Sequence, residues 1–318
     1  MSCELIMTVE EMQDRKAWLE MRKQGLGGSD AAVVVGLSKW KSQWDLWLEK
    51  TGQVEIEDVD NEYLEAGRRL EDTIAQWFCD KTNKKVRRCG MLRSKEYPWA
   101  LADVDRLVVG ENAFLECKTA ASWKLDEWEG DNLPDAYWCQ LCHYMFVGGY
   151  EKAYIAVLVG GNKFIWKEVC RNEEDIEALI EAEKYFWEHN VVAKELPEVD
   201  GSKACAQAIS AHFNGDGTEA IELESEYDLL CKDLEILKDE KKKLELAIAT
   251  KENKLKVALG NGQFGRTAKF NVYFKTTNRT TFNAKQFEKD YPELYNKYLN
   301  NTSYRSLRIH ESKARMND

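Results

Sequence analysis

The sequence predicts an α/β protein in which a central mixed sheet is flanked by helices. Two observations carry this prediction: pairs of short apolar strands over residues 101–119 and 152–170, and helical periodicity before, between and after them. With 318 residues, the chain has room for one large domain or two ordinary ones. We expect a first domain over residues 1–195, a linker and long helix over 196–260, and a small basic α+β extension over 261–318.

The composition restricts the class of protein. Apolar residues make up 44% of the chain and charged residues 32%, which is typical of a globular protein. The net charge of -11 argues against a surface coated with basic residues, but an enzyme of nucleic acid needs only a local basic groove. No apolar run has the length of a membrane helix, and the N-terminal residues lack the pattern of a signal peptide. We therefore expect a cytoplasmic protein without a membrane partner, whose nine cysteines stay reduced.

The N-terminal region is predicted to be helical. Residues 10–24 have helical spacing, and a Gly-rich break over residues 25–28 interrupts them. Ser29 and Asp30 can then cap a second helix. Such a break suits a phosphate group, because main-chain N–H groups point outward at a helix start. The alternative, which these residues alone favour, is a corner whose glycines serve only the geometry of the turn.

Two amphipathic helices follow. Residues 39–51 carry one apolar face, which we expect in the core: Trp40, Trp44, Trp47 and Leu48. Residues 61–83 form a longer helix with a buried stripe: Leu70, Ile74, Trp77 and Phe78. Glu71 lies beside that stripe, where it could pair with Arg68 or Lys81, or complete a metal site.

The central stretch, residues 101–119, is predicted to be a hairpin with its turn at residues 110–112. Side chains alternate between the two faces of a strand. Glu116 and Lys118 should therefore point to one face of the return strand, and Cys117 to the other.

Acidic residues on the first strand of this hairpin extend the pattern. Asp103 and Asp105 are expected on one face, so that acidic side chains and one lysine converge. Mg²⁺ prefers carboxylate oxygens, and a lysine beside it can orient a water or steady a developing negative charge. This is the chemistry of metal-assisted phosphodiester cleavage. Taken alone, Asp105, Glu116 and Lys118 favour the alternative, a surface hairpin of solvated charges.

A mostly apolar helix is predicted after Pro134. Gln140 and Tyr144 lie four residues apart and share a face of this helix. A glutamine can hold an attacking water or a phosphate oxygen, because it has both a donor and an acceptor. Residues 139–143, CQLCH, also match the attachment pattern of c-type haem. We discount haem because no export signal is present, and zinc because no second ligand pair is evident.

The second strand pair, 152–159 and 163–170, is followed by a helix that begins at Asn172. Residues 196–219 have weak periodicity and form a plausible boundary. A long helix then places apolar residues at heptad positions: Tyr227, Leu230, Leu234, Leu237, Leu244, Ile248 and Leu255. A short coiled coil and an ordinary helix laid on the core explain this pattern equally well.

The C-terminal region has a different charge balance. Residues 261–318 contain eleven Lys and Arg against five Asp and Glu, which gives a net charge of +6. Aromatic side chains are interleaved with the basic ones in the strand-like segments 270–282 and 303–310. This combination suits a nucleic-acid backbone. The alternative is a solvated module that balances an acidic core.

The order of the motifs over residues 10–190 resembles the YqaJ-type viral recombinases, which are relatives of the phage lambda exonuclease among the PD-(D/E)xK nucleases. The matching residues are, in chain order, Trp18, Arg22, Gly27 to Ala31, Gly67 to Glu71, Ala102 to Asp105, Leu115 to Lys118, Gln140 and Tyr144. The resemblance implies a restriction-endonuclease-like core. Val104 departs from the family pattern, which often has Pro there, and Asp103 stands where the family usually has a small residue. Asp103 and Tyr144 are possible supports of the site.

The resemblance also implies roles for single residues. The metal, Mg²⁺ with Mn²⁺ as a possible substitute, would be held by Glu71, Asp105, Glu116 and the main-chain carbonyl of Cys117. Lys118 would activate or position the attacking water, with support from Gln140. Arg22 and Ser29 match positions that grip the 5′-phosphate of DNA in the family.

The implied activity is processive 5′→3′ digestion of one strand at double-stranded DNA ends. The 3′ single-stranded tails that result would feed a single-strand annealing protein, in the cytoplasm of a bacterial host if a phage encodes the chain. Family members commonly form a ring-shaped trimer. The alternatives are a related endonuclease, a 3′→5′ nuclease, and a non-catalytic DNA-binding assembly protein.

Overall fold

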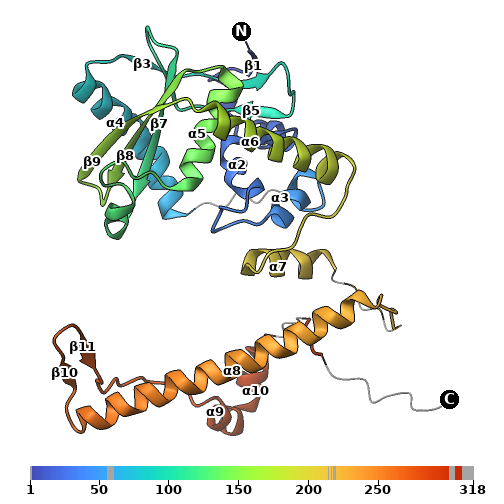
Figure 1. Ribbon diagram of the computed structural model, residues 1–318, viewed down its shortest axis with the longest axis vertical. Helices are drawn as coiled ribbons and strands as arrows, with labels where there is room; N and C mark the ends of the chain where they lie inside the picture. The colour runs from blue at the N-terminus through green and yellow to red at the C-terminus, as the bar shows by residue number, and fades with distance from the viewer. Residues whose placement is uncertain are drawn as a thin grey trace. The chain divides into compact units, whose positions relative to one another are not determined.

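The computed structural model of the chain describes residues 2–55, 61–213, 215, 217, 220–300 and 305–309. Its residue contacts divide the chain into two units, residues 1–213 and 214–318 (Figure 1). The first unit has the predicted α/β class, with mixed sheets flanked by helices. Within the described ranges, no helix is both long and apolar enough to cross a membrane.

The central sheet of the first unit has five strands in the order β3-β6-β7-β8-β9. The neighbours β7 and β8 are parallel and the other neighbours are antiparallel, so the sheet is mixed as predicted. The strands are β3 (Val86–Arg87), β6 (Arg106–Val108), β7 (Ala113–Ala120), β8 (Lys152–Val159) and β9 (Lys163–Cys170). Gly110 makes the turn between β6 and β7 with a φ of 85°, which glycine adopts without strain.

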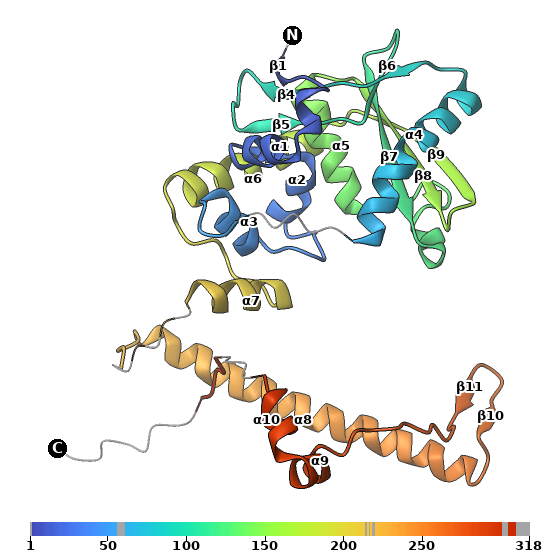
Figure 2. The same cartoon turned by 180° about the vertical axis from the view of Figure 1, so that it is seen from behind.

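Two helices cover this sheet from opposite faces, α4 (Glu62–Thr82) and α5 (Asp135–Gly148) (Figures 1 and 2). Leu115 of β7 packs in one apolar cluster with Ile74 of α4. Phe114, on the other face of the strand, lies against the Tyr144 ring of α5 with ring centroids 5.8 Å apart. Side chains alternate along β7, so Glu116 points to the α5 side together with Phe114.

A second sheet in the same unit has four strands in the order β1-β4-β5-β2. These strands are β1 (Cys3–Met7), β4 (Met91–Ser94), β5 (Ala100–Ala102) and β2 (Leu26–Gly27). The remaining helices of the unit are α1 (Arg15–Lys23), α2 (Gly28–Val34), α3 (Gln43–Lys50), α6 (Glu173–Tyr185) and α7 (Lys203–His212). Short 3₁₀ segments span Glu11–Gln13 and Ser122–Glu127, and a π-helical segment over Phe186–Val192 continues α6. The predicted start of α6 is confirmed, because the Asn172 side chain caps it.

The prediction of one continuous strand over residues 101–109 is wrong. The chain instead forms β5 and β6, which belong to different sheets. The Oδ2 atom of Asp105 accepts a hydrogen bond from the Cys117 N–H at 2.7 Å. A side chain therefore takes the place of a main-chain ladder bond, and β6 begins only after Asp105. Asp103 and Asp105 consequently do not share the face of a strand.

The predicted core position of Trp40 is also wrong, because its side chain is 88% exposed. Ser42 and Asp45 form a capping box, so α3 begins only at Gln43 and Trp40 precedes the helix. The other two tryptophans of the segment, Trp44 and Trp47, are buried as predicted.

The first unit extends to Phe213, beyond the boundary that we expected near residue 195. The segment expected to be an irregular connection contains α7, which packs on α3. The rings of Trp44 and Trp47 lie 5.8 Å and 5.2 Å from the ring of His212. Burial of these tryptophans explains why α7 belongs to the first unit.

The second unit consists of α8 (Glu226–Leu259), a hairpin of β10 (Phe264–Arg266) and β11 (Asn271–Tyr273), α9 (Ala284–Asp290) and α10 (Pro292–Lys297). No side chain of α8 is buried, and heptad residues such as Leu230 and Leu244 are exposed. The strand-like segments are shorter than predicted. Only Asn271–Tyr273 of the first is a strand, and residues 305–309 of the second are irregular. Residues 303, 304 and 310 lie outside the described residues.

Candidate active site

Glu116 is the centre of the candidate site. It lies in the middle of β7 and is 3% exposed. Its Oε1 atom accepts a hydrogen bond from Lys118 Nζ at 2.6 Å and another from Gln140 Nε2 at 2.7 Å. The structure therefore joins three of the predicted catalytic side chains, two from β7 and one from α5.

Asp105 reaches the same place from the segment before β6. Burial raises the pKa of this carboxyl well above its usual range, and the negative charge of Glu116 raises it further. Burial also raises the pKa of Glu116, although the Lys118 ammonium opposes that shift. Asp105 and Glu116 therefore lie in a low-dielectric environment, and the positive charge near them does not fully compensate their negative charges.

An unpartnered oxygen shows where a cation would fit. The Oε2 atom of Glu116 is buried and has no hydrogen-bond partner. Such an atom is costly, because it has lost its water without a replacement. The oxygens of Asp105 and Glu116 are ligands that Mg²⁺ prefers, so the residues fit this ion. Within the described part of the chain, no three His, Cys, Asp or Glu side chains form a ready-made metal cage.

Glu71 makes a contact that the sequence did not predict. Its Oε1 atom accepts a hydrogen bond from the buried Arg106 guanidinium. The same guanidinium donates to Asp72 and to the main-chain carbonyl of Asp105. Arg106 directly follows the predicted metal ligand Asp105 in the sequence, and this position could have indicated the contact.

Lys118 carries a positive charge at neutral pH. Burial alone would lower its pKa, but the charges of Glu116 and Asp105 outweigh burial and raise the pKa above its usual value. The ammonium also lies 5.2 Å from the centroid of the Tyr137 ring. Lys118 can therefore donate hydrogen bonds in this site.

A chain of polar contacts leads from Glu116 to a second group of residues. Gln140 Nε2 lies 3.4 Å from the Tyr144 hydroxyl, which donates to Asp103 Oδ1 at 2.8 Å. Asp103 Oδ1 in turn lies 3.6 Å from the guanidinium of Arg22. Asp103 therefore faces Arg22, whereas Asp105 faces Glu116.

Arg22 and Ser29 line a cavity of about 280 Å³. The Arg22 guanidinium donates to Ser29 Oγ at 2.9 Å and to Asp30 Oδ2 at 3.0 Å. Asp30 also accepts from the Gly27 N–H at 3.0 Å. The predicted cap is thus shifted: Gly27 precedes the first residue of α2, and Asp30 caps the helix from its third position. A Cβ atom on Gly27 would lie 1.7 Å from Arg22, so this network requires glycine.

The charges in this network stabilise one another. Burial alone would raise the pKa of Asp30, but Arg22 and Lys50 outweigh it and hold that pKa far below its usual range. Burial alone would lower the pKa of Arg22, but Asp30 and Asp103 raise it. Both groups are therefore ionised at neutral pH.

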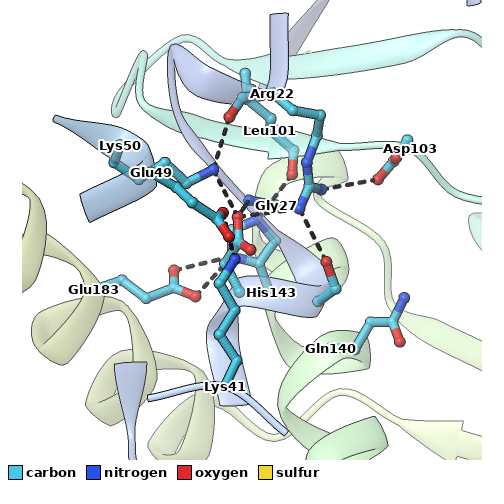
Figure 3. A network of polar contacts seen from close by, with 12 residues as sticks. Arg22, Gly27, Lys41, Glu49, Lys50, Leu101, Asp103, Gln140, His143 and Glu183 are labelled. Carbon is cyan, nitrogen blue, oxygen red and sulfur yellow. Dashed lines mark hydrogen bonds and ion pairs between the residues drawn. The ribbon is translucent and has the colours of Figure 1, made fainter. Parts of the chain in front are cut away.

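A buried ion pair behind these residues was not predicted either. His143 Nδ1 lies 2.9 Å from the Glu183 carboxylate, and His143 Nε2 lies 2.9 Å from the Leu101 carbonyl (Figure 3). Burial would lower the pKa of His143, but the charge of Glu183 raises it, so the imidazolium donates to both partners. Residues 139–143 are buried within α5, which accounts for the CQLCH pattern without haem.

Comparisons with known proteins agree with this arrangement. A model of the YqaJ-like viral recombinase domain matches residues 17–151. Over 310 residues the chain is 36% identical to the uncharacterized protein YqaJ of Bacillus subtilis (strain 168). The alignment covers 96% of this chain and 97% of that protein.

Two solved structures superpose on part of this chain. An alkaline exonuclease from Laribacter hongkongensis superposes with a TM-score of 0.49 at 16% identity, over 56% of this chain and 93% of that one. A phage-related exonuclease from Haemophilus somnus 129PT superposes with a TM-score of 0.39 at 12% identity, over 54% of this chain and 96% of that one. The match to YqaJ along nearly the whole length of both chains shows the relationship directly: this chain belongs to the YqaJ-like viral recombinase family.

Proposed function

We propose that the chain is a metal-dependent deoxyribonuclease that digests double-stranded DNA from its 5′ ends and leaves 3′ single-stranded tails. Family membership supports a recombination enzyme. The observation that carries the proposal is the buried Glu116 carboxylate, with Lys118 and Gln140 on one oxygen and no partner on the other. A surface hairpin of solvated charges would not bury these groups.

Asp105, Glu116 and the Cys117 carbonyl are the proposed ligands of Mg²⁺, for which Mn²⁺ can substitute, with Glu71 as a further ligand. When bound, such an ion supplies Lewis-acid activation of the scissile phosphate and neutralises developing charge. Glu71 can join the ligands only in competition with Arg106, which holds its carboxylate in the structure.

The proposed role of Lys118 follows from its protonation. As an ammonium it orients the attacking water and stabilises negative charge on the phosphate oxygens. Gln140 uses its amide nitrogen on Glu116. Its carbonyl oxygen is then positioned to accept a hydrogen bond from the same water.

Arg22 and Ser29 are proposed to bind the terminal 5′-phosphate. A guanidinium suits this task because it can donate two parallel hydrogen bonds to phosphate oxygens. The contacts from Gln140 through Tyr144 and Asp103 to Arg22 connect this cavity to the proposed cleavage site.

The test is digestion of linear 5′-phosphorylated duplex, labelled at one end, with Mg²⁺ or with EDTA. We expect Mg²⁺-dependent release of nucleotides from the 5′ end. Lys118→Ala should lower the rate by about 10²–10³-fold. Lys124→Ala, which removes an exposed lysine of the same region, should leave the rate within about twofold. An unchanged rate in Lys118→Ala would overturn the site, and cutting of a covalently closed circle would indicate the endonuclease alternative.

The proposed enzyme would assemble both with copies of itself and with a partner protein. The chain would form a ring-shaped trimer, and it would deliver its product to a single-strand annealing protein. Light scattering of the purified chain should then give three times its mass, whereas a monomer would refute the ring.

A further inference from the structure

Lys50, the last residue of α3, lies buried beneath Arg22, and its side chain is only 2% exposed. We propose that Lys50 is a positioning residue of the Arg22 cavity and sets the preference of the enzyme for 5′-phosphorylated over 5′-hydroxyl ends, an inference that rests on the exonuclease function proposed above. The contacts of Lys50 reach Arg22 in two ways (Figure 3).

The first contact fixes the main chain that carries Arg22. Lys50 Nζ donates to the Arg22 carbonyl at 2.7 Å. Arg22 belongs to the last turn of α1, where carbonyl groups have no partner within the helix. A cation at this end of a helix is also favoured by the helix dipole. Lys50 therefore closes the end of α1 and holds the Cα position of Arg22.

The second contact balances charge around the guanidinium. Lys50 Nζ lies 2.9 Å from Asp30 Oδ2, the same oxygen that accepts from Arg22. Arg22 faces two carboxylates, Asp30 and Asp103. Without Lys50 these three groups would sum to a net charge of -1 and repel a phosphate. With Lys50 the sum is zero, and the Arg22 guanidinium can serve an incoming anion.

The other charged groups that line the cavity do not replace Lys50. Lys41 and Glu49 pair with each other, and Arg15 lies over the Trp18 ring with 4.3 Å between its guanidinium carbon and the ring centroid. Burial lowers the pKa of Lys50 to about 8, although Asp30 opposes the shift. Lys50 should therefore lose its charge in the mildly alkaline range.

The test compares initial rates on two duplexes that differ only in a 5′-phosphate or a 5′-hydroxyl end. The ratio of the two rates cancels general damage to the fold or to the metal site, which would affect both substrates equally. For Lys50→Met we expect the ratio to fall at least about tenfold. Lys84→Met, which removes another ion-paired lysine, should change the ratio by no more than about twofold.

A pH series provides a measurement that does not depend on a folded Lys50→Met variant. In the wild type the ratio should fall as the pH rises through about 8, because Lys50 loses its proton. The 5′-phosphate does not titrate there, since its second pKa is about 6. Lys50→Arg should abolish this fall, because a guanidinium stays charged.

The outcomes separate this inference from the proposed function. If the wild type digests neither duplex, the exonuclease function fails. If it prefers 5′-phosphate ends and Lys50→Met keeps the preference, or if the ratio is constant across the pH series, the role of Lys50 is overturned.

Discussion

Two aspartates, the partly buried Asp105 and the buried Asp30, should respond to neutralisation with opposite signs. The pKa of Asp105 is raised in the folded protein, by burial and by Glu116, so folding disfavours its charged form. The protonated Asp105 side chain stabilises the folded state. This contribution is lost as the pH rises from the unfolded pKa of about 3.9 through the raised folded pKa. At neutral pH, Asp105→Asn should therefore stabilise the protein while it removes the proposed metal ligand.

The expected gain in the free energy of unfolding follows from the contact that Asp105 makes. Asn keeps an oxygen for the Cys117 N–H, so only the charge is removed. Relief of an under-compensated buried charge should be worth about 1–2 kcal/mol. For a unit of 213 residues, this corresponds to a rise in Tm of about 2–8 °C.

Asp30→Asn is the matched control. The pKa of Asp30 is held low, because two cations outweigh its burial. Its charge therefore contributes stability above the unfolded pKa, and neutralisation leaves Arg22 and Lys50 buried without a counter-ion. The cost should be about 3–5 kcal/mol, or a fall in Tm of at least about 6 °C.

Thermal unfolding followed by circular dichroism, at neutral pH with EDTA, measures both effects. Addition of Mg²⁺ should then raise the Tm of the wild type but not that of Asp105→Asn, since a ligand stabilises only the state that binds it. A lower Tm for Asp105→Asn in EDTA would refute the electrostatic reasoning.

Two further predictions concern pH and packing. Because the pKa values of Asp105 and Glu116 are raised, both should take up protons at a higher pH than ordinary carboxylates. The nuclease rate should therefore fall as the pH drops from neutral into the mildly acidic range, and a rate that stays constant over this range would contradict this. Gly28→Ala should cost about 1–3 kcal/mol in the free energy of unfolding, because its Cβ would lie 2.6 Å from the Tyr144 ring. Gly67→Ala should instead add about 0.5–1 kcal/mol, since the nearest atom to its Cβ lies 3.9 Å away in a helix interior; equal effects in denaturant titrations would refute the packing.

Local periodicity explains what the sequence could predict. Glu116 and Lys118 share a face because strand alternation has a fixed period of two, and Gln140 and Tyr144 do so because a helix brings positions i and i+4 together. The structure confirms both pairs, since Lys118 Nζ donates to Glu116 Oε1 and Gln140 Nε2 lies 3.4 Å from the Tyr144 hydroxyl. Neither relation depends on the rest of the fold.

The separation of Asp103 from Asp105 could not be predicted in this way. A strand pattern continues through both residues, and only the contact between Asp105 and the Cys117 N–H breaks it. That contact requires β7 to lie in place beside it. The exposure of Trp40 has a similar origin, because the cap at Ser42 decides where α3 begins.

Two ion pairs could not be predicted from the periodicity of the sequence. Glu71 pairs with Arg106, which is 35 residues further along the chain, and His143 pairs with Glu183, which is 40 residues away. A charged residue on a helix usually marks the solvent face. Only the packing of the helices shows that Glu183 is buried.

The central claim is that the Glu116 carboxylate, whose Oε2 atom has no hydrogen-bond partner, belongs to a metal-dependent cleavage centre. The direct measurement is the rate of nucleotide release from 5′-phosphorylated linear duplex by the wild type and by Glu116→Gln, with Mg²⁺ and with EDTA. The variant keeps the shape of the side chain and an acceptor for Lys118 and Gln140, but it removes the charge. We predict release by the wild type in Mg²⁺, none in EDTA, and a rate at least about 10²-fold lower for Glu116→Gln. Release by Glu116→Gln at the wild-type rate would contradict the claim.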